Sequence, residues 1–130
     1  IRELGLNEAL DRYMQNFAHR SGLKCILHIA DNFNCNNEST SLTIYRIVQE
    51  ALSNVIRHAK ATESRVKIES IKHQWLISIE DNGTGMTEKP DDKFSLGLTG
   101  MKERAHMINA EFEIISNAGG TKINIVIPIR

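Results

Sequence analysis

The feature that most constrains the fold is a set of strand-like runs that come in adjacent pairs. Residues 65–71 and 75–79 carry apolar side chains largely at alternate positions, and a short polar link joins them. Residues 111–115 and 122–127 repeat this arrangement around a Gly-Gly pair. Alternation of this kind is typical of a strand with one buried face, and a short turn between two such runs predicts a hairpin. Four of the expected strands therefore form two antiparallel pairs.

Three other segments show the apolar spacing of helices. We expect these helices over residues 8–20, 44–59 and 101–108. The second has the strongest periodicity in the chain: its apolar residues run over 44–59, and the helix itself is expected to begin a little earlier, at Thr40 or Ser41, because short hydroxyl side chains favour helix starts.

A further strand is expected over residues 24–29, which gives the order α-β-α-β-β-α-β-β. This order holds too few strand–helix–strand crossovers for a doubly wound parallel sheet. The predicted fold is α+β: a two-layer α/β sandwich in which helices cover one face of a mixed, largely antiparallel sheet. At 130 residues the chain is expected to form a single domain, residues 1–130.

Composition and charge limit what the chain binds, the state of its thiols and its relation to a membrane. Sixteen basic and sixteen acidic residues give a net charge of zero, so no basic field argues for nucleic acid. Cys25 and Cys35 form no CxxC pair; one disulfide is allowed, and two free thiols in a reducing cytosol are expected. No apolar run approaches the roughly 20 residues that span a bilayer. The N-terminus has neither an initiating Met nor a signal-peptide pattern, which indicates a fragment of a longer protein.

The strongest helix carries a polar stripe opposite its apolar side. Glu50, Asn54 and Arg57 fall within an arc of roughly 60°, and His58 lies beside it. A stripe of this kind is also typical of the solvated face of a surface helix. However, Asn is a poor helix former, and a carboxylate and an amide oxygen one turn apart are ligands that Mg²⁺ accepts. The helix is therefore a candidate cation site.

Two glycine clusters follow the first hairpin. Residues 81–85 read Asp-Asn-Gly-Thr-Gly, which is either an ordinary turn after a strand or a place where backbone lies against a flat ring. In the second case Asp81 would accept a hydrogen bond from an exocyclic amine. Residues 97–100 read Gly-Leu-Thr-Gly and precede the expected helix over residues 101–108, so they are either a flexible loop or a phosphate site at a helix N-terminus.

Taken in this order, the three segments resemble the GHKL (Bergerat-fold) ATPases, in the form found in two-component sensor histidine kinases of the NarL/UhpB/DesK type. Residues 49–59 resemble the N box, residues 81–86 the G1 box and residues 97–105 the G2 box. The Gly-Leu-Thr-Gly-Met-Lys-Glu-Arg string is the most specific of them. Gly120-Thr121 and the alternating residues after it are similar to the closing strand of the family, so the resemblance covers nearly the whole chain.

The resemblance implies that the chain binds ATP and Mg²⁺. Asn54 would hold the metal ion, and Glu50 would be the catalytic residue that orients or deprotonates the attacking group. Asp81 would bind the adenine amino group. The residues implied to bind the nucleotide and its metal are Asn54, Arg57, His58, Asp81, Gly83, Gly85, Met86, Gly97, Leu98, Thr99, Gly100, Met101 and Thr121.

The resemblance also implies the partners of the domain. The γ-phosphoryl would pass to a histidine on a separate dimerisation domain of the same parent protein, for relay to a response regulator. The dimerisation and sensor domains are expected outside this chain, and the isolated domain is expected to be monomeric. The expected location is cytoplasmic, including the case of a parent sensor in the inner membrane with this domain on its cytoplasmic side.

Two other functions are compatible with the same residues. One is another GHKL protein, such as an anti-sigma-type protein serine kinase or an ATP-hydrolysing machine; the G2 string argues against it. The other is a non-catalytic module with a degenerate nucleotide site. Such a site should have lost some of its polar residues, whereas Glu50, Asn54, Asp81 and the glycines are all present.

Overall fold

The structure is a computed structural model that describes residues 5–55, 60–83, 92–117 and 119–129. It contains the predicted order of elements. These are α1 (Gly5–Ser21), β1 (Lys24–Ile29), α2 (Glu38–Asn54), β2 (Glu63–Ile71), β3 (Gln74–Asp81), α3 (Asp92–Met107), β4 (Glu111–Asn117) and β5 (Gly120–Pro128).

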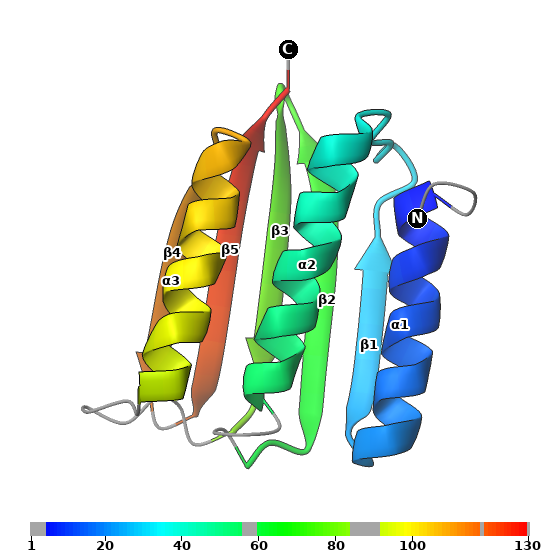
Figure 1. The fold of residues 1–130 in the computed structure, drawn as a ribbon. Coiled ribbons are helices and arrows are strands. Elements are labelled where there is room, and N and C mark those ends of the chain that lie inside the picture. The colour runs from blue at the N-terminus through cyan, green and yellow to red at the C-terminus, as the bar shows by residue number, and fades with distance from the viewer. Residues whose placement is uncertain (1–4, 56–59, 84–91, 118, 130) are drawn as a thin grey trace.

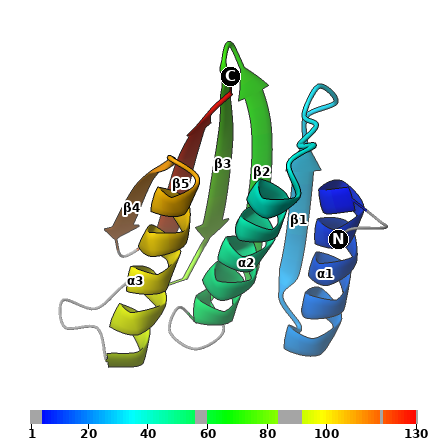
Figure 2. The same ribbon diagram turned by 45° about the horizontal axis from the view of Figure 1, so that its top comes forward.

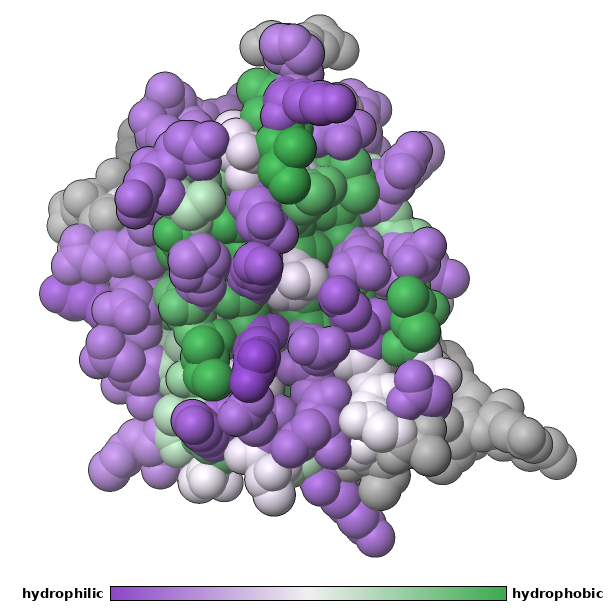
Figure 3. Space-filling view, turned by 180° about the vertical axis from the view of Figure 1, so that it is seen from behind, coloured by the Kyte–Doolittle hydropathy of each residue, from purple (hydrophilic) through white to green (hydrophobic). Residues whose placement is uncertain are grey.

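The strands form one mixed sheet in the order β1-β2-β3-β5-β4. Only β1 and β2 run parallel; β2–β3, β3–β5 and β4–β5 are antiparallel. The three helices lie side by side on one face of this sheet (Figures 1 and 2). The predicted α+β sandwich is therefore confirmed. The sheet's other face is predominantly hydrophilic, with scattered apolar side chains (Figure 3).

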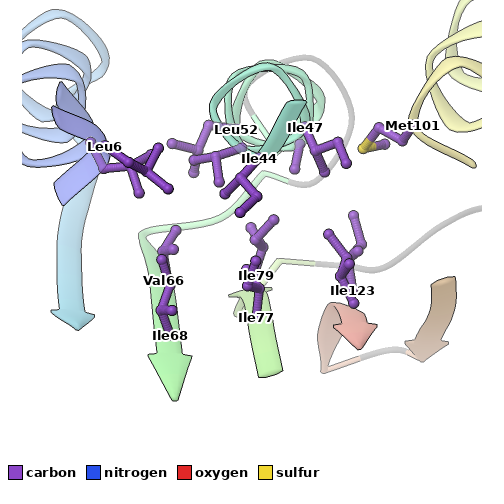
Figure 4. Close-up of a cluster of buried hydrophobic side chains, with 14 of the residues drawn as sticks. Leu6, Ile44, Ile47, Leu52, Val66, Ile68, Ile77, Ile79, Met101 and Ile123 are labelled. Atoms are coloured by element: carbon purple, nitrogen blue, oxygen red, sulfur yellow. The ribbon is translucent and has the colours of Figure 1, made fainter. Parts of the chain in front are cut away.

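The core lies between the helices and the sheet. Ile44, Ile47 and Leu52 of α2 point down onto the sheet, where Ile68 and Ile77 rise to meet them (Figure 4). These five side chains are at most 1% exposed. Because α2 occupies the middle of its layer, it buries one whole side and fixes the position of every other residue on that helix.

The first two helices begin earlier than their sequence predicts. Helix α1 begins at Gly5 and ends at Ser21, followed by Gly22 at a φ of +76°. Helix α2 begins at Glu38, not at Thr40 or Ser41. Its N-cap is Asn37, whose Oδ1 accepts a hydrogen bond of 2.9 Å from the Thr40 N–H.

Helix α3 also departs from its predicted start. It begins at Asp92, nine residues before the predicted residue 101. The apolar residues Leu98, Met101 and Ala105 extend one helical stripe against the core. This packing favours a helix that continues through Gly100. Gly100 is not required there by close contact, because an added Cβ would meet nothing within 4 Å. Residues 97–100 are therefore part of the helix and do not precede it.

Two remaining predictions concern the thiols and the membrane. Cys25 and Cys35 are both free thiols, as predicted. Burial raises the pKa of the Cys25 thiol above its ordinary value. Among the described residues, no helix has the length and apolar character needed to cross a membrane.

Candidate functional site

Asp81 is the last residue of β3 and lies at the edge of the core. It is 8% exposed, and its Oδ1 accepts a hydrogen bond of 2.8 Å from the backbone N–H of Gly83, which is also buried. The strand register places it between Ser64 of β2 and Thr121 of β5. An aspartate is buried at a strand end only when polar groups surround it, so this position is built for a polar contact.

The protonation of Asp81 follows from its surroundings. Burial raises the pKa of the Asp81 carboxyl above its ordinary value, and the neighbouring charge of Glu80 adds to this rise. The backbone N–H groups of Gly83 and Thr121 act in the opposite direction. Burial is the largest of these effects. A ligand that donates a hydrogen bond to the carboxylate would favour its charged form.

Asp81 belongs to a polar row that crosses the sheet on its helix-facing side. Ser64 is fully buried and its Oγ donates to the Glu80 carbonyl at 3.2 Å. On the other side of Asp81, the hydroxyl oxygens of Thr121 and Ser116 lie 3.2 Å apart in a hydrogen bond. The next row into the core is apolar. The sheet therefore ends in hydroxyl and carboxylate groups, which suit a polar heterocycle.

Gly120 makes the close approach of β5 to Asp81 possible. Its φ is +140°, and a Cβ at this position would overlap the carbonyl oxygen of Asp81. Only glycine combines that φ with that contact. The sequence places Gly120 in a turn and in the closing strand, but the contact with Asp81 becomes visible only in the folded structure.

The next residue, Asn82, ties this strand end to the segment before β2. Its Oδ1 accepts hydrogen bonds from the N–H groups of Thr62 at 2.9 Å and Glu63 at 3.0 Å. Its Nδ2 donates to the Thr62 Oγ1 at 2.9 Å. Sequence reasoning takes Asn82 only as part of a turn dipeptide. Its partners are distant in sequence, so no local signal reveals them.

Helix α2 brings Glu50 and Asn54 to the same end of the molecule. The carboxyl ends of α2 and β3 both lie at the lower end in Figure 1, where α3 begins. Asn54 is 6% exposed and Glu50 is partly exposed, so Asn54 does not lie on a solvated face. Arg57 and His58 lie outside the described residues, as does the predicted end of this helix.

The glycine-rich segments are placed in part. Met101 is completely buried and Leu98 packs against the core, while Thr99 is exposed. Gly97 and Gly100 lie within α3, so the backbone N–H groups of this stretch belong to the interior of a helix. The predicted position of this segment, just before the start of a helix, is therefore wrong. Gly85 and Met86 lie outside the described residues.

Glu50 and Asn54 offer oxygen donors of the kind that Mg²⁺ accepts. Among the parts of the chain that are described, no group of three or more His, Cys, Asp or Glu side chains could enclose a metal ion. Magnesium commonly takes one or two protein oxygens and completes its shell with water and phosphate. The amide oxygen of Asn54 and the carboxylate of Glu50 fit that requirement; an all-protein metal cage is not needed.

Comparison with known proteins places this geometry in a family. Residues 39–130 match the family model described as "Histidine kinase-, DNA gyrase B-, and HSP90-like ATPase". The chain is 36% identical over 130 residues to the signal transduction histidine-protein kinase/phosphatase DegS of Brevibacillus brevis, covering 99% of this chain and 34% of that protein. It is 36% identical over 126 residues to the sensor histidine kinase LiaS of Bacillus subtilis, covering 96% of this chain and 34% of that protein.

A solved structure shows the same fold. The histidine kinase domain of the blue-light activated kinase EL346 from Erythrobacter litoralis superimposes with a TM-score of 0.83 and 23% identity, over 96% of this chain and 61% of that chain. The chain therefore belongs to the family of histidine kinase-, DNA gyrase B- and HSP90-like ATPases. Within it, the chain is similar over nearly its whole length to a part of these sensor histidine kinases. It spans about a third of the length of these curated relatives.

Proposed function

We propose that this domain binds ATP with Mg²⁺ and transfers the γ-phosphoryl group to a histidine on another domain of its parent protein. The buried Asp81 carboxylate at the end of β3 carries this proposal. It is held by the Gly83 N–H and flanked by Thr121, and it therefore presents acceptor oxygens in a partly desolvated place. An adenine amino group supplies the missing kind of partner, a donor, whereas the oxo group of guanine would meet the carboxylate with another acceptor.

The base would lie against the glycine backbone that follows β3. Gly83 is buried beside Asp81, and Gly120 lets β5 approach the same point. Thr121 would contact the ring together with Gly83, Gly85 and Met86. The hydroxyl of Thr121 is already oriented by Ser116, which favours a fixed hydrogen-bond pattern around the base.

The phosphates would extend from the base toward the carboxyl end of α2. Asn54 would hold Mg²⁺ with its amide oxygen, and Glu50, one turn earlier, would orient or deprotonate the attacking histidine nitrogen. Arg57 and His58 would contact phosphate oxygens. When bound, Mg²⁺ neutralises phosphate charge and polarises the γ-phosphoryl group. The oxygen–phosphorus bond to ADP breaks as the nitrogen–phosphorus bond forms. Because this transfer requires little covalent chemistry from the protein, the domain chiefly positions the reactants.

Residues 97–100 would bind phosphate only after a local change in α3. Their N–H groups lie inside the helix, where they are engaged with carbonyl groups one turn earlier. Gly97 and Gly100 each weaken a helix by about 1 kcal/mol relative to alanine, which lowers the free energy needed to open this stretch. We propose that Gly97, Leu98, Thr99 and Gly100 contact the phosphates in an opened form, while Met101 remains the core anchor of the helix.

The remaining partners would be other domains and proteins. The acceptor histidine would lie on a dimerisation domain of the same parent, and the phosphoryl group would pass from there to a response regulator. The domain over residues 1–130 would be a monomer on its own and would act on the cytoplasmic side. The curated relatives are about three times as long as this chain, which is long enough to include such domains.

Calorimetric titration with ADP and ATP in the presence of Mg²⁺ tests the nucleotide site. We expect Asp81→Asn to weaken binding by about tenfold or more, because a charge-assisted hydrogen bond is lost. Absence of binding to the wild-type domain at millimolar nucleotide would contradict the proposal. Equal binding by Asp81→Asn would contradict the role assigned to Asp81.

A second experiment tests the phosphoryl acceptor. A parent protein that includes the upstream helices should form acid-labile phosphohistidine when supplied with ATP. Glu50→Gln should slow this transfer with little effect on ADP affinity, because Glu50 is assigned to the attacking group. Acid-stable phosphoserine on a partner protein would instead assign the domain to the protein serine kinases of the same family.

A further inference from the structure

Asn82 makes more contacts than a turn residue requires. Its side chain is exposed, yet it forms hydrogen bonds with the Thr62 N–H, the Glu63 N–H and the Thr62 hydroxyl. In addition, its backbone N–H donates to the Glu63 carbonyl at 3.3 Å. All of these contacts are with the short segment that enters β2. An exposed side chain with this many contacts fixes one backbone segment against another.

The segment that Asn82 holds is the connection between α2 and β2. Residue 60 has a φ of 51°, which turns the chain sharply after the helix. Thr62 is also fixed on its other side, because its carbonyl oxygen accepts a hydrogen bond of 3.0 Å from the Lys24 N–H at the start of β1. The described end of the connection, residues 60–62, is therefore anchored at Thr62 to both neighbouring strand ends, and Asn82 supplies the anchor on the side of Asp81.

The residues assigned to the two halves of the nucleotide site belong to the two chain segments that Asn82 holds together. Asp81, assigned to the base, is the residue immediately before Asn82 in the chain. Glu50 and Asn54, assigned to phosphate and metal, lie on the helix that leads into the anchored connection. A ligand that must reach both halves at once binds well only if their separation is fixed before it arrives.

We propose that Asn82 is a positioning residue that sets the base half of the site relative to the phosphate and metal half. This inference rests on the nucleotide-binding function proposed above. Asn82 acts through Thr62 and Glu63 and has no assigned contact with the nucleotide. The essential atom is Oδ1, because it accepts two of the three side-chain hydrogen bonds.

Substitutions at residue 82 separate this role from general stability. Asn82→Ala removes all three side-chain contacts. Asn82→Asp keeps an acceptor for both N–H groups and can accept a hydrogen bond from the Thr62 hydroxyl. The matched control is Asn32→Ala, which removes an exposed Asn that donates to the Ser70 carbonyl at 3.2 Å, near the end of β2 farthest from Asp81. Circular dichroism establishes that each variant is folded.

Affinities for two ligands provide the readout. One is a non-hydrolysable ATP analogue with Mg²⁺, which spans both halves; the other is AMP without Mg²⁺, which relies mainly on the base half. For Asn82→Ala we expect about tenfold weaker binding of the analogue but at most about twofold weaker binding of AMP, because misalignment penalises the ligand that spans both halves. Asn82→Asp should stay within about threefold of wild type for the analogue, and Asn32→Ala should match wild type.

Several outcomes would overturn the inference. These are unchanged affinity of Asn82→Ala for the analogue, an equal loss for both ligands, and the same selective loss in Asn32→Ala. Failure of the wild type to bind either ligand would overturn the proposed function itself, and this inference with it. If Asn82→Ala does not fold, Asn82→Ser takes its place, since its shorter side chain cannot reach both N–H groups, and the same comparison decides.

Discussion

At the residue scale, the site combines groups that sequence patterns reveal with groups that they do not. Asp81 is predictable because it ends an alternating strand and precedes a glycine cluster. Glu50 and Asn54 are predictable because helical periodicity separates them from the apolar side. Ser64, Ser116 and Gly120 are different, because their roles come from cross-strand contacts. Strand register determines which residues become neighbours, and the register cannot be read from a single sequence.

The constraint on Gly120 predicts a large effect of adding one methyl group. We expect Gly120→Ala to destabilise the domain by about 2–4 kcal/mol, because the new Cβ overlaps the Asp81 carbonyl at a φ of +140°. Urea unfolding measures this change. The control is Gly100→Ala, whose Cβ meets nothing within 4 Å in a helix and should stabilise by about 0.5–1 kcal/mol. Similar effects of the two substitutions would contradict the assigned contact.

The raised pKa of Asp81 predicts a conflict between stability and binding. A carboxyl whose pKa is higher in the folded state binds its proton more tightly there, so its ionised form destabilises the fold at pH 7. Asp81→Asn should therefore make the nucleotide-free domain more stable than wild type near neutral pH. This advantage should shrink as the pH falls through the raised pKa and disappear below the ordinary value of 3.8. Denaturant unfolding between pH 3 and 7 measures the difference, and a gain that grows toward low pH would contradict it.

At the element scale, the types and order of helices and strands follow from periodicity, whereas helix starts do not. The predicted start of α2 relied on the hydroxyl residues Thr40 and Ser41, yet Asn37 caps the helix. Both kinds of residue favour caps, so the decision comes from tertiary packing: Ser41 is 4% exposed and its Oγ donates to the Cys35 carbonyl. Helix α3 is longer than predicted for a related reason, because Leu98, which precedes the predicted start at residue 101, also packs against the core.

The cap assignment for α2 is open to a direct test. Asn37→Ala should destabilise the domain by about 1 kcal/mol, because the Thr40 N–H loses its acceptor at the first turn. Thr40→Ala leaves that N–H and its bond in place and should change stability by less than about 0.5 kcal/mol. Thermal or chemical unfolding of both variants provides the comparison. A larger effect of Thr40→Ala than of Asn37→Ala would restore the start expected from the sequence alone.

At the scale of the whole molecule, the residues assigned to the proposed nucleotide site come from elements that end or begin at one end of the sandwich. The end of β3, the end of α2 and the start of α3 all lie at the lower end of the molecule in Figure 1. The chain segments that lie there are far apart in sequence, and the antiparallel pairing of β3 with β2 and β5 brings them together.

This arrangement predicts that nucleotide stabilises the whole domain cooperatively. A ligand that binds only the folded state raises stability by about 2.7 kcal/mol at a free concentration of 100 times its dissociation constant. ADP with Mg²⁺ should therefore raise the melting temperature of the wild type by several degrees, and the rise should increase with ligand concentration. Without nucleotide, Asp81→Asn should have a higher melting temperature than wild type at pH 7, because it lacks the buried charge. Nucleotide should raise its melting temperature only slightly, because the variant binds nucleotide more weakly. A nucleotide-induced rise in Asp81→Asn equal to that of wild type would show that the base is held elsewhere on the sheet end.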